Sequence, residues 1–120
     1  MLAQSVATDA MARSLAAGRV VDIPVVPTLA DGLAGAIDEH GLDVGRHALD
    51  EMVTVEESQI ADAIRVLALD EKVTAEGSGA VGVAALLTGS ARVVDPVVVV
   101  ISGGNIDEDV LAAVLQPRKT

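Results

Sequence analysis

The chain has 120 residues, of which 8 are Lys or Arg and 18 are Asp or Glu, so its formal net charge is -10. A chain of this length forms one domain at most, and its acidic balance argues against nucleic-acid partners, which bind basic surfaces. Hydrophobic residues make up 51% of the sequence and aromatic residues 0%. We therefore expect a globular fold whose core consists of small and branched aliphatic side chains.

The absence of cysteine excludes disulfides, thiolate metal ligands and a cysteine nucleophile. Because the first residues also carry no secretory signal pattern, the sequence predicts a cytoplasmic location. No apolar run approaches the ~20 residues of a membrane span, so we expect no membrane role. His40 and His47 stand two helical turns apart, but Gly41 and Gly45 weaken a helix there, which favours solvated histidines over a metal pair.

Helical and strand-like segments alternate along the chain, which favours an α/β fold. The Ala-rich stretch 8–17 predicts a helix that ends at Gly18. Residues 19–27 should be extended, because two prolines prevent a helix. Residues 29–37 form a short helix candidate that glycine loosens.

A strand is expected at Glu51–Val55. Thr54 and Glu57 have the spacing of a capping box, which predicts the start of the next helix. That helix should reach about Lys72, because four of its apolar residues form one stripe: Ile60, Ala63, Ile64 and Leu67.

Small residues from Ser78 to Leu87 predict a closely packed helix that Gly89 ends. Val97–Ile101 shows no polar alternation, which is typical of a strand covered on both faces of a parallel sheet. We expect this strand to be central and fully buried. Residues 106–115 predict a last helix, with acidic residues in its first turn that suit the helix dipole.

The turn after this expected central strand, Ser102 to Asn105, would lie at the carboxyl end of the sheet, where open α/β folds bind ligands. Gly103 and Gly104 allow close approach to the backbone, and Ser102 offers a hydroxyl. The alternative is a tight turn in which Ser102 is a local cap. A phosphate at the following helix is disfavoured, because three acidic residues would repel it: Asp107, Glu108 and Asp109.

Glu76 precedes a glycine- and serine-rich helix start. It is either an acid near a helix N-terminus or a partly buried carboxylate beside a cleft that binds a cationic group. Asp31, which precedes Gly32, is likewise either a turn residue or a cleft residue.

Five stretches occur in one order: "AMARSLAAGR", "PTLADGLAG", "VTVEESQIADAI", "AEGSGAVGVAALL" and "VVVVISGGNID". This set resembles the C-terminal part of the threonine/serine dehydratases, which depend on pyridoxal 5'-phosphate (PLP) and have the fold type II, or tryptophan-synthase-β-like, structure. The resemblance covers nearly the whole chain. It implies that residues 1–120 form a single, incomplete domain with part of a parallel sheet.

The resemblance implies a PLP cofactor whose pyridine nitrogen faces Ser102, with Gly103, Gly32 and Glu76 in the same pocket. A serine partner leaves the ring nitrogen largely unprotonated, which suits β-elimination of a hydroxy amino acid to a 2-keto acid and ammonia. In the family, a lysine that lies N-terminal to these motifs forms the Schiff base. The resemblance therefore implies that the chain contributes no catalytic residue, and that its lysine, substrate-loop and phosphate-loop segments would precede Met1.

Two lysines are present, Lys72 and Lys119, and neither has the desolvated setting of a Schiff-base lysine. Some relatives bind a divalent cation ahead of the "AMARS" helix, but Asp9 is the sole carboxylate in that stretch, so we expect no metal site.

The sequence is accordingly interpreted as a dehydratase-like C-terminal segment that is inactive alone. It is either a truncated gene product or one half of a split enzyme. It would act on a hydroxy amino acid only in a complete enzyme, and the possible partners are an N-terminal half or further copies in a homo-oligomer. The alternative function is a non-catalytic binding or interaction module. A free-standing hydrolase is disfavoured, because no Ser/His/Asp arrangement is indicated.

Overall fold

The computed structural model describes residues 1–117 and contains a small parallel sheet. Strand β1 (Leu2–Ser5) pairs with β2 (Met52–Val55), with Leu2 opposite Met52 and Ser5 opposite Val55. Parallel strands need a long connection, and the 46-residue stretch between these two contains α1 and α2. The expected α/β class and the expected strand at Glu51–Val55 are confirmed.

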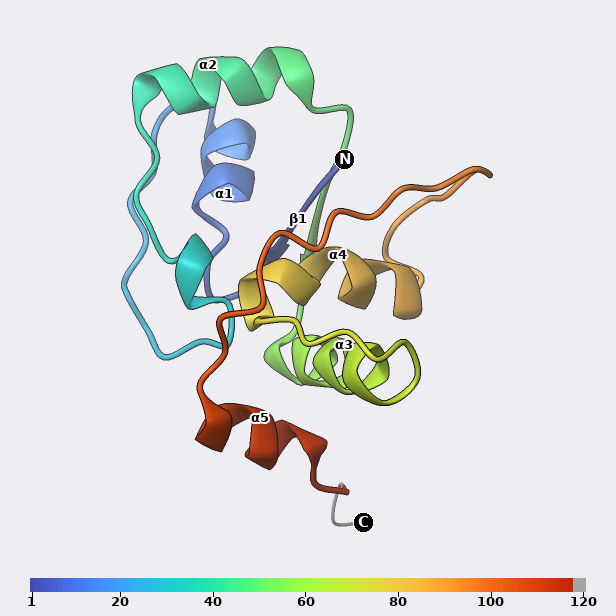
Figure 1. Ribbon diagram of the computed structural model, residues 1–120. Coiled ribbons are helices and arrows are strands. Elements are labelled where there is room, and N and C mark those ends of the chain that lie inside the picture. Colours follow the sequence, from blue (N-terminus) through green and yellow to red (C-terminus); the bar gives the residue numbers. More distant parts are fainter. Residues whose placement is uncertain (118–120) are drawn as a thin grey trace.

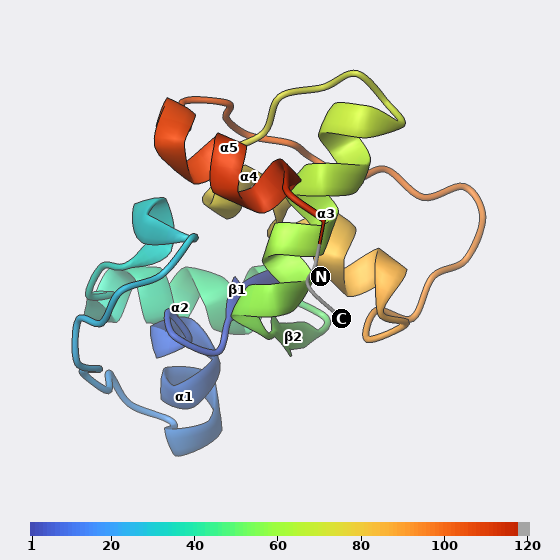
Figure 2. The ribbon, with the colours of Figure 1, turned by 90° about the horizontal axis from the view of Figure 1, so that it is seen from below.

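Residues 1–117 also form six helical segments, which are arranged about the sheet and one another as Figure 1 shows. Helices α1 and α2 pack together at one end of the molecule, while α3 packs against both α4 and α5 at the other (Figures 1 and 2). In chain order they are α1 (Ala10–Ala17), the 3-10 turn η1 (Asp31–Leu33), α2 (Glu39–Ala48), α3 (Glu57–Leu69), α4 (Gly77–Leu87) and α5 (Glu108–Leu115). No helix within residues 1–117 is long and apolar enough to span a bilayer.

In residues 1–50 the observed structure agrees with the sequence-based predictions except at one helix. Helix α1 ends at Gly18, whose φ of 72° is a left-handed conformation that glycine adopts without strain. Residues 19–27 contain no helix, and the helix candidate at 29–37 is reduced to the three residues of η1.

The exception is α2, where the expectation that glycine weakens a helix was wrong. The side chain of Asp38 caps this helix by accepting a hydrogen bond from the N–H of Gly41 at 2.7 Å. Leu42 is fully buried, and Gly45 lies so close to α1 that a Cβ there would come 2.9 Å from Met11 Sδ. Tertiary packing thus outweighs the low helix propensity of glycine. His40 and His47 are both exposed, as expected.

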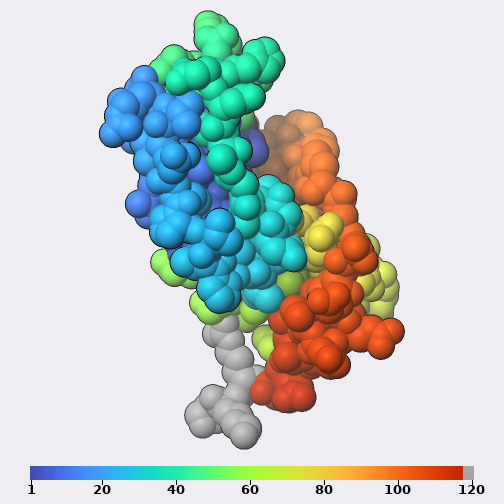
Figure 3. All heavy atoms as spheres, turned by 90° about the vertical axis from the view of Figure 1, so that its left-hand side faces the viewer, coloured from blue at the N-terminus to red at the C-terminus, as the bar shows by residue number. Residues whose placement is uncertain are grey.

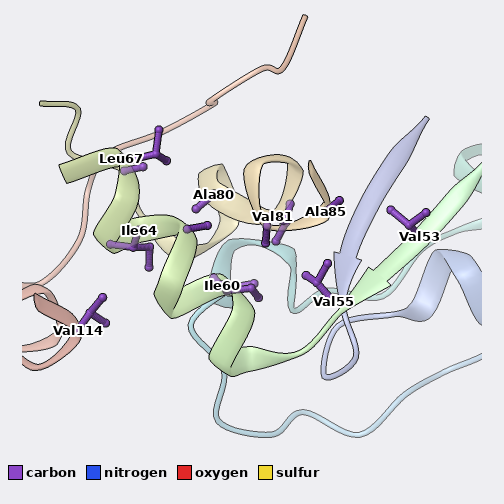
Figure 4. Packing of buried hydrophobic residues seen from close by; sticks show 13 residues of the cluster. Val53, Val55, Ile60, Ile64, Leu67, Ala80, Val81, Ala85 and Val114 are labelled. Atoms are coloured by element: carbon purple, nitrogen blue, oxygen red, sulfur yellow. The ribbon is translucent and has the colours of Figure 1, made fainter. Parts of the chain in front are cut away.

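The core lies between α3 and α4 (Figure 4). The four residues of the predicted stripe on α3 are all buried and face small side chains of α4 such as Ala80 and Ala84. Burial of each large aliphatic side chain contributes about 1.5–3 kcal/mol. The capping box, however, is formed by Glu56 and Gln59 and not by Thr54 and Glu57, because the helix begins three residues after Thr54.

Helices α4 and α5 have the expected positions. Helix α4 is followed by Gly89 with φ 72°, and acidic residues occupy the first turn of α5. Arg65 of α3 holds the other end of α5, because its Nη2 donates to the carbonyls of Val114 at 2.5 Å and Gln116 at 2.7 Å.

The prediction that Val97–Ile101 is a fully buried central strand is wrong. This segment forms no strand, and the side chains of Val98 and Val100 are 88% and 76% exposed. Val99 faces the molecule, since a Cβ at Gly82 of α4 would lie 2.9 Å from its Cγ1. A buried strand needs neighbouring strands for its N–H and C=O groups, and within residues 1–117 none pairs with this segment. The chain that follows it lies at the surface beside the start of α4 (Figure 3).

Candidate functional site

The predicted site residues gather around the N-terminal end of α4. Glu76 is the N-cap residue of this helix, and its N–H donates a hydrogen bond to the carbonyl of Gly103 at 3.1 Å. The turn after Val97–Ile101 is thereby fixed to the start of α4. Ser102 and Glu76 consequently belong to the same side of the molecule, although 25 residues of chain separate them.

Close backbone contacts hold this turn against α4. A Cβ at Gly103 would lie 1.9 Å from Oε1 of Glu76, and a Cβ at Gly79 would lie 2.7 Å from the carbonyl oxygen of Gly103. A Cβ at Gly104 would lie 2.5 Å from the carbonyl oxygen of Thr74. Real Cβ atoms do not approach other atoms this closely, so the main-chain contacts require glycine at positions 79 and 104. At position 103 a Cβ would displace the carboxylate of Glu76, which is the end of a flexible side chain.

Gly32 lies on the other side of the α4 N-terminus. A Cβ there would come 2.8 Å from Oγ of Ser78. That hydroxyl is buried and has no hydrogen-bond partner, whereas most buried hydroxyls have one. Ser78 stands within one of the family motifs, but the sequence assigned it no role. The signal that identifies it is a hydroxyl in the first turn of a helix that otherwise consists of glycine and aliphatic residues.

A cleft of about 560 Å³ begins at these residues. The hydroxyls of Ser78 and Ser102 make one end of it polar, and apart from Arg92 the remaining lining residues are apolar. Of the four predicted site residues, Ser102 alone lines the cleft directly. Gly32, Glu76 and Gly103 adjoin the lining residues, and their close packing determines where the cleft wall lies.

Charged groups are scarce in the described lining, where Arg92 is the single charged residue and no lysine occurs. Lys72 lies beyond the end of α3 in an exposed turn, and its Nζ donates to the carbonyl of Leu69 at 2.5 Å. Lys119 lies outside the described residues. Asp9 pairs with Arg13 at 2.9 Å, and the described part of the chain holds no cluster of three potential metal ligands.

The arrangement therefore offers two hydroxyls at the end of an apolar cleft. Hydroxyls can donate to a neutral ring nitrogen or accept from a polar substituent, and apolar walls favour a flat, uncharged ring. The residues of this site belong to η1, α4 and the turn 102–104, three segments that lie far apart in the sequence.

Comparisons with known proteins identify the family. Residues 1–103 match the family described as pyridoxal-phosphate dependent enzyme. An L-threonine ammonia-lyase from Thermotoga maritima is 44% identical over 108 residues, which are 88% of this chain and 26% of the relative. A serine racemase from Arabidopsis thaliana is 37% identical over 105 residues, or 82% of this chain and 32% of the relative.

Solved structures of similar proteins support the same family. The crystal structure of a T.th. threonine deaminase gives a TM-score of 0.80 at 34% identity, and the match covers 88% of this chain and 40% of the deaminase. The structure of maize serine racemase gives a TM-score of 0.81 at 31% identity, and the match covers 93% of this chain and 36% of the racemase chain. The chain thus spans between a quarter and two fifths of the length of these relatives. The expected resemblance is confirmed, and the chain belongs to the family of pyridoxal-phosphate dependent enzymes.

Proposed function

We propose that the chain is the C-terminal segment of a threonine/serine dehydratase-like ammonia-lyase and forms the wall of its PLP cleft that faces the ring nitrogen. In this proposal residues 1–120 are a single, incomplete domain. The observation that carries it is the placement of the Ser102 hydroxyl at the end of an apolar cleft, on a turn that Glu76 and three glycines hold in position. Similarity to threonine ammonia-lyases supports the reaction class.

The residues at this end of the cleft fit the ring of the cofactor. The buried hydroxyl of Ser78 lacks a partner, which is the condition expected of a group that bonds to a ligand. The close packing at Gly32 and Gly103 keeps side chains away from the cleft wall. A phosphate group needs several donors or cations, and the described lining supplies Arg92 alone. These residues therefore fit the pyridine side of PLP and leave its phosphate to other parts of the enzyme.

When bound, the cofactor supplies the electron sink for β-elimination of a hydroxy amino acid. Ser102 would donate a hydrogen bond to the ring nitrogen without transferring a proton, because an aliphatic hydroxyl is a very weak acid. Glu76 would not contact the ring in this role. Its N–H donates to the carbonyl of Gly103, the residue after Ser102, and thereby holds Ser102 in position. In this role Ser102 binds and orients, and Glu76 is a positioning residue.

No lysine of residues 1–117 lines the cleft, so we propose that the catalytic lysine and the phosphate loop belong to polypeptide outside this chain. The partner is an N-terminal enzyme half or another protomer, and the substrate is a hydroxy amino acid such as threonine or serine. A cytoplasmic location, which the sequence predicts from the absence of cysteine and of a secretory signal pattern, stays a prediction. Exposed valines along 97–101 favour a second candidate function, a non-catalytic interaction module.

A chimaera tests the proposal. The matched 108 residues of the Thermotoga maritima L-threonine ammonia-lyase are replaced by the corresponding residues of this chain, and cofactor absorbance and ammonia release from threonine and serine are measured. We expect both. Ser102→Ala removes one hydrogen bond, a loss of about 1 kcal/mol, and should weaken cofactor retention.

Ser102→Asp should favour a protonated ring and impair elimination while the cofactor still binds. A chimaera that is active and indifferent to both substitutions would show that Ser102 is not the partner of the ring nitrogen. A folded chimaera without cofactor or activity would favour the interaction module.

A further inference from the structure

The carboxylate of Glu57 makes hydrogen bonds that its place at the start of α3 does not require. Glu57 is the first residue of this helix, which Glu56 and Gln59 already cap. Its Oε2 accepts from the hydroxyl of Ser5, and its Oε1 accepts from the N–H of Leu29 at 2.6 Å. No lysine or arginine of residues 1–117 forms an ion pair with it. One half-buried carboxylate therefore joins the end of β1, the segment before η1 and the start of α3.

The surroundings of Ser5 fix the direction of its bond to Glu57. The Ser5 hydroxyl accepts from the N–H of Ala7 at 3.0 Å, so its own proton is available for the carboxylate. Ser5 is fully buried and lies opposite Val55, at the carboxyl ends of both strands. A carboxylate offers acceptors only, which matches its two donors. Hydrogen bonds to a charged acceptor are stronger than neutral ones, so the link between the three segments is firm.

The bond to Leu29 holds a segment that has few other hydrogen bonds. Within the described chain, no main-chain group of residues 19–29 bonds to another main-chain group. Near the start of this segment, the hydroxyl of Ser14 accepts from the N–H of Val21 at 2.9 Å. At its end, the N–H of Leu29 donates to Glu57. The bond to Glu57 thus connects the segment to α3 directly before η1 begins.

The position of Leu29 affects the wall of the cleft. A Cβ on Gly77 would lie 1.9 Å from the carbonyl oxygen of Leu29, so the two main chains are in direct contact at the start of α4. In η1, which follows, a Cβ on Gly32 would lie 2.8 Å from the Ser78 hydroxyl, and Leu33 lines the cleft. Because these contacts are close-packed, a displacement of Leu29 would move η1 away from α4 and open a gap beside Ser78.

We propose that Glu57 is a positioning residue of the cofactor site, which holds η1 against the start of α4 and so fixes Gly32 beside Ser78. This inference rests on the proposed function. Glu57 does not line the cleft, so it acts through Leu29 and not by contact with a ligand. What matters in this role is the reach of an acceptor oxygen to the N–H of Leu29.

The same carboxylate also has a more general effect, because a negative charge at the N-terminus of α3 favours the helix dipole. Two substitutions separate the effects. Glu57→Asp keeps the charge but shortens the side chain, whereas Glu57→Gln keeps the length and an acceptor oxygen but loses the charge. Glu39→Asp is the matched control, since Glu39 is the first residue of α2 and is exposed.

The first test is an absorbance titration with PLP of the chimaera that carries this chain in the Thermotoga maritima L-threonine ammonia-lyase. Glu57→Asp should raise the Kd of PLP by about tenfold or more, because the bond to Leu29 is lost. Glu57→Gln should raise it by less than about threefold, because that bond is kept. Glu39→Asp should leave the Kd unchanged.

Gly32→Ala gives a readout that a role in folding alone would not move. Its methyl group meets the Ser78 hydroxyl only while η1 lies against α4. Gly32→Ala should therefore raise the Kd of PLP when Glu57 is present and should have little further effect together with Glu57→Asp. Fold-changes in Kd that multiply independently in this double-mutant cycle would contradict the path from Glu57 to Gly32.

Hydrogen exchange of the isolated chain tests the contact without the cofactor. The amides of Leu29 and Leu33 should exchange at least about tenfold faster in Glu57→Asp than in the native chain. In Glu57→Gln and Glu39→Asp they should exchange nearly as in the native chain. Far-UV circular dichroism of each variant should be unchanged, which shows that the helices are retained.

Failure of this inference and failure of the proposed function give different results. A chimaera that binds no PLP with any of these residues would contradict the proposed function, and exchange at Leu29 would then decide whether Glu57 holds η1. A chimaera that binds PLP and releases ammonia equally well with Glu57→Asp would overturn the positioning role alone. An equal loss with Glu57→Gln or with Glu39→Asp would also overturn it, because the loss would not follow the bond to Leu29.

Discussion

The carboxylate of Glu76 lies against Gly103 so closely that a Cβ on Gly103 would come 1.9 Å from its Oε1, while the N–H of Glu76 bonds to the Gly103 carbonyl at 3.1 Å. The helix start and the serine-bearing turn thus share a main-chain and a side-chain contact. The position of Ser102 depends on both, because it precedes Gly103 directly.

Gly103→Ala should lower the free energy of unfolding of the chain by about 1 kcal/mol, because the added methyl group displaces a side chain that can rotate away. In the Glu76→Ala background the same substitution should cost nothing measurable. Urea denaturation of the four proteins in this double-mutant cycle gives the coupling. Equal costs in both backgrounds would contradict the contact.

Gly77→Ala should be more damaging, with a loss of about 3 kcal/mol. A Cβ there would lie 1.9 Å from the carbonyl oxygen of Leu29, and a main-chain group cannot rotate away as a carboxylate can. Gly35→Ala is the control, because no atom lies within 4 Å of its Cβ position. Thermal and urea unfolding should show that Gly77→Ala is clearly less stable than Gly35→Ala. Equal stability of Gly77→Ala and Gly35→Ala would exclude the close packing of α4 on Leu29.

Arg65→Met should detach α5 from α3 while keeping the aliphatic stem of the side chain. The guanidinium donates to the last carbonyls of α5, and hydrogen bonds to charged groups contribute about 1.5–3 kcal/mol. Hydrogen exchange of residues 111–115 should accelerate relative to the native chain. Arg13→Met, which removes an ion pair whose arginine is 58% exposed, should cost less than about 1 kcal/mol. Unchanged exchange in α5 would show that Arg65 does not hold it.

Lys72 should not form a stoichiometric adduct when the chain is incubated with PLP and treated with borohydride. It is exposed, bonds to the carbonyl of Leu69 and does not line the cleft. A Schiff-base lysine is activated by a desolvated setting, which an exposed amine lacks. Peptide mapping should find low labelling scattered over the amines of the chain. One full equivalent on Lys72 would contradict its placement outside the site.

Local patterns in the sequence were sufficient for most helices. The apolar stripe of α3 was predicted residue by residue, because a period of 3.6 residues specifies which side chains face the core. The end of α1 at Gly18 could be predicted for a similar reason, since a left-handed residue favours glycine whatever the helix contacts. The motif order also identified the family and directed attention to Ser102, Gly103, Gly32 and Glu76.

Other features depend on contacts between segments far apart in the sequence. Helix α2 forms despite two glycines because Leu42 is buried and Gly45 packs on Met11. The burial of the unpaired Ser78 hydroxyl cannot be predicted from its own helix, because it depends on packing with Gly32 and other distant residues. Val97–Ile101 has the composition of a buried strand, but a strand forms only where a neighbour accepts its hydrogen bonds. Composition and periodicity are properties of one segment, whereas strand pairing and buried hydrogen bonds require two. For that reason only the tertiary structure revealed the cleft.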